Sequence, residues 1–451
     1  MKILFAFENP LPNVEADAEV FTATAKHLLP YASQAWLHVP VSEGAQGEYA
    51  AALTGIPVLR ARAPLRPAAL RHFACGTSLV SRPEFREADF VYTRNLWVAW
   101  AALSSGQRVV FDHYRPWPDQ IPPLRPWIRR MMCNPRFLAH ITHSEYTRVP
   151  YLELGVSTEK LFCVHNGFDP SRVEGMIAPD EAKRRIGIDP ARKTVVYTGR
   201  INQKKGLELA IEAARSLPEH LFLLVGSYGR GPIEMLAKDV PNVRTIPWQH
   251  SPESLRQYLD AADVLMIPPS LRPLAEYGST VIPLKLYLYM GTGRPILAGD
   301  TPDVREILED GRNALLCRPD SVESLVKGIR ALTDGSPLAG RLAAASLADS
   351  RGFTWSARAA KIASILQSRL GSAATECPAR GVGEPFGAWA EQSRRWVIHL
   401  IRNRSWVLPS RADAPALTPA PAEAPALTPA RADTAALTPA AVGGQPPGAR
   451  G

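Results

Sequence analysis

Short apolar runs alternate with amphipathic stretches through the first part of the chain. The first six residues have the β-rich pattern of a buried strand. Similar runs recur at 35–39, 89–92, 108–111 and 161–164. Strands separated by helical patterns predict βαβ units and therefore a parallel sheet. We expect residues 1–170 to form one α/β domain.

The alternation is interrupted around 168–190, where Asp-Pro and Pro-Asp pairs punctuate a linker-like stretch. A second series of β-rich runs follows at 194–197, 221–225, 264–267 and 295–298. We therefore expect a second α/β domain over 171–350, joined to the first by a hinge. Parallel sheets bind ligands outside the carboxyl ends of their strands, so the expected site is a cleft between those two edges.

The composition changes after Leu370. Residues 409–451 contain nine prolines, and the sequence Ala-Leu-Thr-Pro-Ala occurs there three times. Such a segment cannot bury enough apolar surface to fold, which predicts a disordered tail over 409–451. The preceding segment, 371–408, is expected to be a linker with a basic amphipathic helix at 388–408. That helix either lies at a membrane surface or docks on the protein body.

Composition and charge narrow the functional classes. The 451 residues carry 52 Lys and Arg against 43 Asp and Glu, a net charge of +9. This excess favours anionic partners such as nucleotide phosphates or lipid head groups, without requiring nucleic acid. The five cysteines are scattered and form no Cys-x-x-Cys pair, so we expect neither a zinc site nor a disulfide framework, and a reducing compartment. With neither a signal peptide nor a spanning segment in the pattern, we expect a cytoplasmic protein or one attached to a membrane face.

The strongest local motif begins where the 194–197 strand ends. Gly199 is followed at once by Arg200, and Lys205 comes at the entry to an amphipathic helix. Two cations beside a helix N-terminus suit a diphosphate, because fixed positive charge and backbone N–H donors converge there. The alternative is a pair of ordinary basic residues on a surface loop.

Further motifs follow in a characteristic order. Gly226 and Ser227 end the 221–225 strand, and Pro283-Leu284-Lys285-Leu286-Tyr287-Leu288-Tyr289-Met290-Gly291 precedes Gly293-Arg294-Pro295. With Gly199-Arg200 and Lys205, this order resembles the donor domain of a retaining GT-B glycosyltransferase of family 4. The resemblance covers 194–335 densely. It extends more thinly over Phe111-Asp112-His113, Ile141–Ser144, Val164–Asp169 and Phe353-Thr354-Trp355.

The resemblance implies a GT-B fold, with two Rossmann-like domains and a helix at 351–370 that crosses back to the first domain. It also implies a nucleotide-sugar donor, no metal or other cofactor, and charge stabilisation of the leaving phosphate by cations. The implied catalytic residues are His113, Arg200 and Lys205. The implied donor-binding residues are Gly199, Arg200, Lys205, Gly226, Ser227, Ile246, Thr280, Leu284 and Leu288. The implied acceptor-binding residues are Asn13, Glu15 and His113.

Two features depart from the family pattern. Family members carry two glutamates eight positions apart, the second of which binds the donor ribose, and this chain has Thr280 and Leu288 there. The loop at 9–17 also lacks the usual glycines. We expect a metal-independent retaining transferase that acts on a glycan, lipid-linked or other glycoside acceptor. The alternative is a catalytically silent GT-B protein that binds a sugar or a partner. A nucleic-acid-binding role finds no recognised module.

Overall fold

A computed structural model describes residues 1–11, 13, 15–40, 45–64, 66–271, 282–372, 377, 386–403 and 408. Residues 1–413 form one compact unit, and the remainder from 414 lies outside the described residues. The expected disordered tail at 409–451 also lies outside them.

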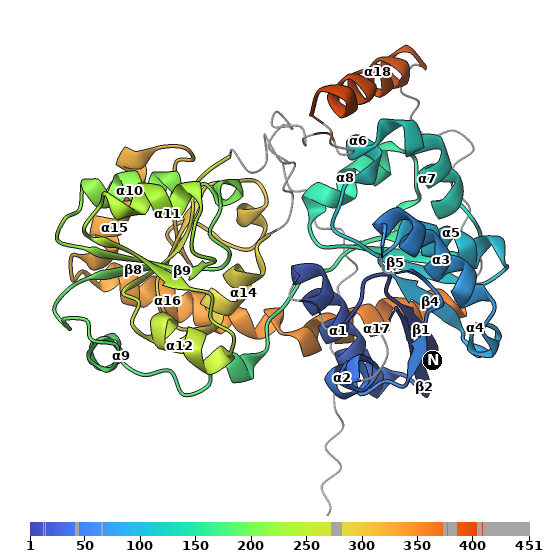
Figure 1. Ribbon diagram of the computed structural model, residues 1–451, viewed down its shortest axis with the longest axis horizontal. Coiled ribbons are helices and arrows are strands. Elements are labelled where there is room, and N and C mark those ends of the chain that lie inside the picture. Colours follow the sequence, from blue (N-terminus) through green and yellow to red (C-terminus); the bar gives the residue numbers. More distant parts are fainter. Residues whose placement is uncertain are drawn as a thin grey trace, which may run out of the picture. The chain divides into compact units, whose positions relative to one another are not determined.

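The first half of the chain forms a seven-stranded parallel sheet (Figure 1). Its strand order is β3-β2-β1-β4-β5-β6-β7, so β4 is the central strand and β1 lies beside it. The strands are β1 (Lys2–Ala6), β2 (Gln34–Val39), β3 (Val58–Arg60), β4 (Phe90–Thr93), β5 (Val109–Asp112), β6 (Phe137–Thr142) and β7 (Leu161–Cys163). The helices are α1 (Ala16–Leu28), α2 (Ala45–Thr54), α3 (Ala68–Val80), α4 (Pro83–Glu87), α5 (Leu96–Ser104), α6 (Trp117–Gln120), α7 (Arg125–Met132) and α8 (Glu145–Glu153).

The second half forms a six-stranded parallel sheet of order β10-β9-β8-β11-β12-β13. Its strands are β8 (Thr194–Thr198), β9 (Leu221–Ser227), β10 (Val243–Pro247), β11 (Val264–Ile267), β12 (Ile296–Gly299) and β13 (Leu315–Cys317). Its helices are α9 (Pro179–Arg185), α10 (Glu208–Arg215), α11 (Pro232–Lys238), α12 (Pro252–Asp260), α14 (Leu284–Gly291), α15 (Val322–Thr333) and α16 (Pro337–Ser350). The two predicted α/β sheets are therefore confirmed.

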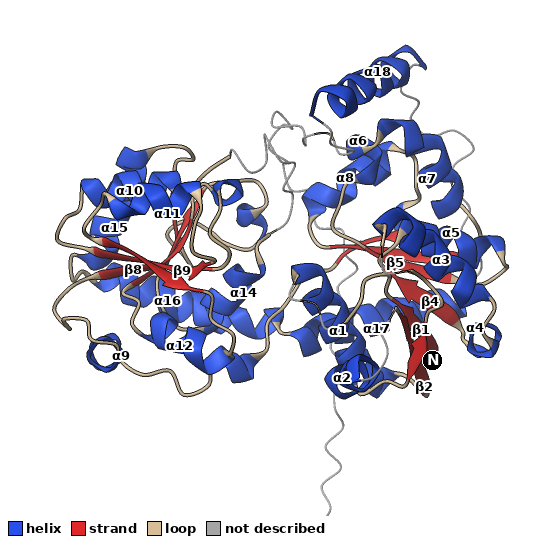
Figure 2. Ribbon diagram, in the orientation of Figure 1, coloured by secondary structure: helices blue, strands red, loops and turns tan. Residues whose placement is uncertain are grey.

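Each sheet is buried on both faces, which explains the near-continuous apolar strands. In β8, Val195 and Tyr197 belong to one apolar cluster, whereas Val196 between them belongs to another. Figure 2 shows the corresponding layers, with α10 and α11 on one side of the second sheet and α12 on the other. This alternation follows from the two-residue period of a strand.

The helix α17 (Trp355–Gly371) packs on the first sheet. Its residues Ala359, Ile362, Ala363 and Leu366 share one apolar cluster with β1. The chain reaches α17 past Gly167, where a Cβ atom would lie 2.5 Å from the backbone carbonyl carbon of Thr354. Only glycine permits that approach, which explains its place in the Asn-Gly turn after β7.

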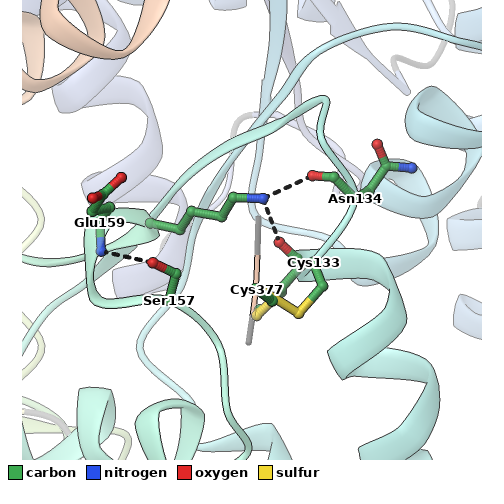
Figure 3. Close-up of a disulfide and its surroundings, with 7 residues drawn as sticks. Cys133, Asn134, Ser157, Glu159 and Cys377 are labelled. Carbon is green, nitrogen blue, oxygen red and sulfur yellow. Dashed lines mark hydrogen bonds between the residues drawn. A yellow bond between two sulfur atoms is a disulfide. The ribbon is translucent and has the colours of Figure 1, made fainter. Parts of the chain in front are cut away.

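The cysteine expectation is wrong for one pair. Cys133 follows α7 and forms a disulfide with Cys377 across 244 positions (Figure 3). Sequence spacing gives no sign of the pair, because the fold alone brings these segments together. Beside the bridge, the Nζ atom of Lys160 donates to the backbone oxygens of Met132 at 3.3 Å and Asn134 at 2.9 Å. A lysine at that place satisfies carbonyl groups at the end of α7.

The expected basic amphipathic helix forms as α18 (Phe386–Asn403), and it docks on the first-sheet domain. The indole N–H of Trp389 donates to the backbone oxygen of Pro122 at 3.1 Å. A residue beyond the helix, Leu408, donates its N–H to the oxygen of Gln120 at 3.0 Å. No described helix is long and apolar enough to cross a membrane.

Candidate functional site

Two glycines bring the carboxyl ends of β8 and β9 into close contact. Gly199 and Gly226 both have φ of +124°, a conformation that other residues rarely adopt. A Cβ atom on Gly226 would lie 2.3 Å from the oxygen of Gly199. A Cβ atom on Gly199 would lie 2.8 Å from the Nζ atom of Lys285. The two turns can therefore pass beside each other and over a lysine side chain only without side chains of their own.

Arg200 projects from the first of these turns. Its Nη2 atom lies 3.1 Å from Oε1 of Glu15, and its guanidinium lies 5.8 Å from the ring centre of Tyr228. The hydrogen bond to Glu15 raises the pKa of Arg200. Glu15 is held by a local turn, because its N–H donates to Oδ1 of Asn13 at 2.8 Å. An expected donor-binding cation and an expected acceptor-binding carboxylate are thus in contact.

A pocket of about 100 Å³ lies at the carboxyl edge of the second sheet. It is lined by Tyr197, Lys204, Lys205, Ile267, Pro268, Ser270, Leu271, Pro283, Lys285, Gly299, Thr301, Asp303 and Val304. Among the described lining residues, Lys204, Lys205 and Lys285 face one acidic residue, Asp303. Burial and the nearby Arg200 and Lys204 lower the pKa of Lys205. An excess of positive charge at this edge suits an anionic ligand.

A second hollow, of about 220 Å³, lies at the opposite edge of the same sheet, beside the amino ends of the strands. Lys193, Asp263 and Pro295 line it, and they immediately precede β8, β11 and β12. Parallel sheets bind ligands at the carboxyl edge, so we place the candidate site in the lysine-lined pocket.

His113 follows β5 at the carboxyl edge of the first sheet and is 6% exposed. It is surrounded by aromatic rings, with those of Phe111, Tyr114 and Trp117 centred 4.7 to 5.6 Å away. The N–H of Arg115 donates to Nδ1 of His113 at 2.9 Å, so the neutral ring carries its proton on Nε2. Burial, and then nearby arginines, hold the pKa of His113 well below its usual value. It is suited to donate a hydrogen bond.

A buried charge network lies behind His113. The carboxylate of Asp112 contacts Nη2 of Arg358 at 2.8 Å, Nε2 of His143 at 2.7 Å and Nη1 of Arg94 at 3.4 Å. Arg94 in turn contacts Oδ1 of Asp17 at 2.6 Å. Burial opposes ionisation of Asp112, but Arg358 and then His143 and Arg94 hold its pKa well below the usual value. The network fixes the strand ends that carry His113.

One group of side chains has the composition of a metal site. The ligand atoms of Cys163, His165 and Glu306 all lie within 4.8 Å of one another. Sequence spacing gives no sign of this group, because only the fold brings Glu306 beside His165, 141 positions earlier. The carboxylate of Glu306 already accepts from the N–H groups of Glu145 and Tyr146 and lies 3.0 Å from His165. These contacts account for the cluster without an ion.

The remaining expected donor-binding residues lie around the same edge. The hydroxyl of Ser227 donates to Glu234 at 2.8 Å and accepts from the N–H of Gly229, so it closes the turn after β9. Ile246 is partly buried in β10, and Leu284 is the first residue of α14. Of the expected donor set, Lys205 lines the pocket, whereas Ser227, Ile246 and Leu284 do not.

The two departures from the glutamate pattern have different outcomes. Thr280 lies outside the described residues. Leu288 is 5% exposed and belongs to the apolar cluster beneath the sheet, not to the lining of the pocket. The expected contact between Leu288 and a donor ribose finds no support in this placement. A leucine at this position of α14 packs like its apolar neighbours.

Several residues at these edges were missed from the sequence. Lys285 is not among the expected site residues. It lies in the apolar stretch of α14, where a lysine is itself a sign of a functional role. Glu8 follows β1, is 6% exposed and leaves its Oε2 atom without a hydrogen-bond partner. Tyr228 and Trp248 stack with ring centres 5.4 Å apart beside Arg200, and only the fold brings them together.

Comparison with known proteins agrees with this geometry. Residues 192–334 match the model of the family described as glycosyl transferases group 1. The putative colanic acid biosynthesis glycosyl transferase WcaI of Escherichia coli is 29% identical over 189 residues, which are 40% of this chain and 45% of WcaI. The α-D-kanosaminyltransferase of Streptomyces kanamyceticus is 27% identical over 170 residues, 36% of this chain and 42% of that protein. The chain thus spans less than half the length of these relatives.

The fold has close structural counterparts. HepE of Anabaena, solved in complex with UDP and glucose, has a TM-score of 0.64 with 18% identity and covers 82% of this chain and 100% of its own. A glycosyltransferase of Rickettsia africae has a TM-score of 0.66 with 12% identity and covers 82% of this chain and 99% of its own. The fold is GT-B, as expected. The segment 192–334, which matches the glycosyl transferases group 1 model, carries the lysine-lined pocket.

Proposed function

We propose that the chain is a metal-independent, retaining glycosyltransferase that moves a sugar from a nucleotide sugar to a glycan, lipid-linked or other glycoside acceptor. The observation that carries this proposal is the lysine-lined pocket at the carboxyl edge of a group 1 domain. Cations there stabilise the charge that builds on the leaving phosphate. The UDP bound to HepE supports a nucleoside diphosphate as the leaving group.

In this mechanism Arg200 and Lys205 bind the diphosphate and need no metal to neutralise it. Arg200 must first exchange Glu15 for a phosphate, because the two are in contact here. His113 donates its Nε2 proton in a hydrogen bond to a sugar or acceptor hydroxyl. Asn13 and Glu15 contact acceptor hydroxyl groups.

A thermal-shift screen of UDP-, GDP- and ADP-sugars tests the donor. A ligand at 100 times its dissociation constant stabilises the folded state by about 2.7 kcal/mol. Transfer is then followed by mass spectrometry of a glycoside acceptor, and anomeric retention by NMR. Turnover that persists in EDTA supports metal independence. Loss of turnover in EDTA, or an inverted product, contradicts the corresponding part of the proposal.

A catalytically silent sugar-binding protein is the second candidate. It is favoured by the burial of Leu288, which leaves no carboxylate at that position for a ribose. This candidate predicts that a nucleotide sugar shifts the melting temperature while neither transfer nor hydrolysis occurs.

A membrane surface is the proposed partner of α18, which would keep the enzyme on the inner face of the cell membrane. Val397, Ile398 and Ile401 are exposed, the last at 73%. Arg394 and Arg395 flank them and share Glu391 as partner. Apolar side chains beside arginines suit an anionic bilayer.

Co-sedimentation with phosphatidylglycerol vesicles tests this partner. The pair of changes Val397→Ser and Ile401→Ser should reduce binding at least several-fold. Leu347→Ser, at a position of α16 that is as exposed as Val397, should leave it unchanged. Equal binding of all variants would show that the membrane contact lies outside these positions of α18.

A further inference from the structure

The helix α14 brings two side chains to the carboxyl end of β8. Lys285 and Tyr289 are four residues apart and therefore share a face of the helix. The hydroxyl of Tyr289 accepts the backbone N–H of Thr198 at 2.7 Å and lies 3.1 Å from its Oγ1 atom. This contact fixes α14 against β8, one turn away from Lys285.

The amine of Lys285 lies under the turn that carries Arg200. Its Nζ atom is 3.6 Å from the ring centre of Tyr197, and it would be 2.8 Å from a Cβ atom on Gly199. The hydroxyl of Tyr197 donates to the backbone oxygen of Arg200 at 3.1 Å. Lys285 also lines the pocket with Lys205. The amine is therefore held between the Arg200 turn and the pocket.

The other described titratable groups around this pocket are two carboxylates, those of Asp303 and Asp320, and two phenols. Asp303 accepts from the hydroxyl of Thr301 at 2.6 Å, and burial raises its pKa. Burial also raises the pKa of the phenols of Tyr197 and Tyr289, so both stay neutral. The carboxylate of Asp320 accepts a hydrogen bond from the hydroxyl of Ser270 at 2.8 Å. Among the described residues, neither Lys205 nor Lys285 forms an ion pair with a carboxylate, so the two amines repel each other when both are protonated.

Burial, and then the charge of Lys205, hold the pKa of Lys285 well below its usual value. Both effects disfavour the ammonium form while the pocket contains no anion. A diphosphate in the pocket reverses the second effect, because its negative charge outweighs the repulsion between the two lysines. Binding of the anion and protonation of the amine then favour each other.

We propose that Lys285 is a third cationic contact for the donor diphosphate and that it takes up a proton from solvent when the diphosphate binds. This inference rests on the proposed function. It adds a residue to the donor site and makes donor affinity depend on pH. The proton remains on the amine until the nucleoside diphosphate leaves.

Isothermal titration of the full-length protein with UDP tests the inference. Titrations at pH 8 and 9 in buffers of different ionisation enthalpy give the number of protons taken up per UDP. The phosphate groups are fully ionised at these pH values, since their second pKa is about 6. We expect an uptake that approaches one proton per UDP at one of these pH values.

Two lysine variants separate a direct role from a general effect of charge. Lys285→Met should abolish the proton uptake and weaken UDP binding at least about ten-fold. Lys204→Met removes a charge from the same pocket, so it should weaken binding while the proton uptake persists. Circular dichroism and the melting temperature establish that each variant is folded.

The outcomes separate this inference from the proposed function. Binding of UDP without proton uptake by the wild-type protein overturns the inference alone, and so does undiminished uptake by a folded Lys285→Met variant. If that variant does not fold, the wild-type measurement still decides. If UDP, GDP, ADP and inorganic pyrophosphate all fail to bind the wild type, both proposals fail.

Discussion

The guanidinium of Arg358 lies 2.8 Å from the carboxylate of Asp112, although 246 positions separate the two residues. Both side chains are almost fully buried. Arg358 also donates to the backbone oxygens of Val164 and His165. Helix α17 is therefore attached at the edge of the sheet that holds His113.

Replacement of Arg358 by methionine should destabilise the protein by about 3–5 kcal/mol, because it leaves the buried Asp112 charge without its main partner. Urea unfolding measures this loss. Arg305→Met is the matched control, since its partner Asp300 lies in an exposed pair, and it should change stability by less than about 1 kcal/mol. A loss of similar size in both variants would contradict the role given to the buried pair.

Arg200→Ala and Lys205→Ala should each lower turnover at least about 10²-fold, because each removes a charge that stabilises the leaving phosphate. Both variants should keep the wild-type melting temperature within a few degrees, since neither Arg200 nor Lys205 belongs to the apolar clusters of the second sheet. Lys238→Ala, at an exposed position at the end of α11, serves as the control. Wild-type turnover in the double alanine variant would refute the assignment.

Glu8 should make stability depend on pH. Burial and the charge of Asp17 raise its pKa to about 7. As pH rises from 4.5, the unfolded chain ionises first, so the folded state loses about 3 kcal/mol by the time pH exceeds 7. Glu8→Gln should remove this dependence and gain stability relative to the wild type as pH rises. Parallel unfolding curves for both proteins from pH 5 to 8 would contradict the prediction.

His113 should remain neutral at pH 6.5, with its proton on Nε2. Histidine ¹H–¹⁵N NMR, with His113→Asn for assignment, reads the tautomer directly. Because its pKa is lowered in the folded state, acidification below 6.5 protonates the unfolded chain first and should reduce stability. A His113 resonance that titrates at or above pH 6.5 would contradict the lowered pKa of this residue.

The disulfide predicts a definite number of reactive thiols. Cys75, Cys163 and Cys317 are free, so alkylation of the denatured but unreduced protein should add three groups and alkylation after reduction should add five. Intact-protein mass spectrometry counts them. Cys377→Ser should give four in both conditions, and five groups in the unreduced wild type would mean that the bridge is absent.

Local patterns predicted the sheets well because each buried strand is a short apolar run. The spacing from Gly199 to Lys205 likewise placed two cations at one strand end, since a strand, a turn and a helix entry are adjacent in sequence. Lys285 was missed because its role depends on how α14 packs against β8. Leu288, read from a motif, is buried because its helix face meets the core.

Local sequence patterns do not predict long-range contacts. The pairs Cys133–Cys377 and Asp112–Arg358 each join residues more than 200 positions apart. Periodicity describes one element at a time and carries no sign of such partners. The sequence pattern of α18 likewise does not predict its docking through Trp389, because an amphipathic helix suits either a protein face or a bilayer.

The contribution of α17 to the core of the first sheet has a consequence for synthesis on the ribosome. Leu366 closes an apolar cluster that begins with Ile3 and Phe5. The last strand of that sheet ends at Cys163, about 200 residues earlier. At 5–20 residues per second, the nascent sheet waits roughly 10–40 s for its final helix. During that interval α1 and α2 cover only part of one apolar face, so chaperones that bind nascent chains have the longest time to act on the rest.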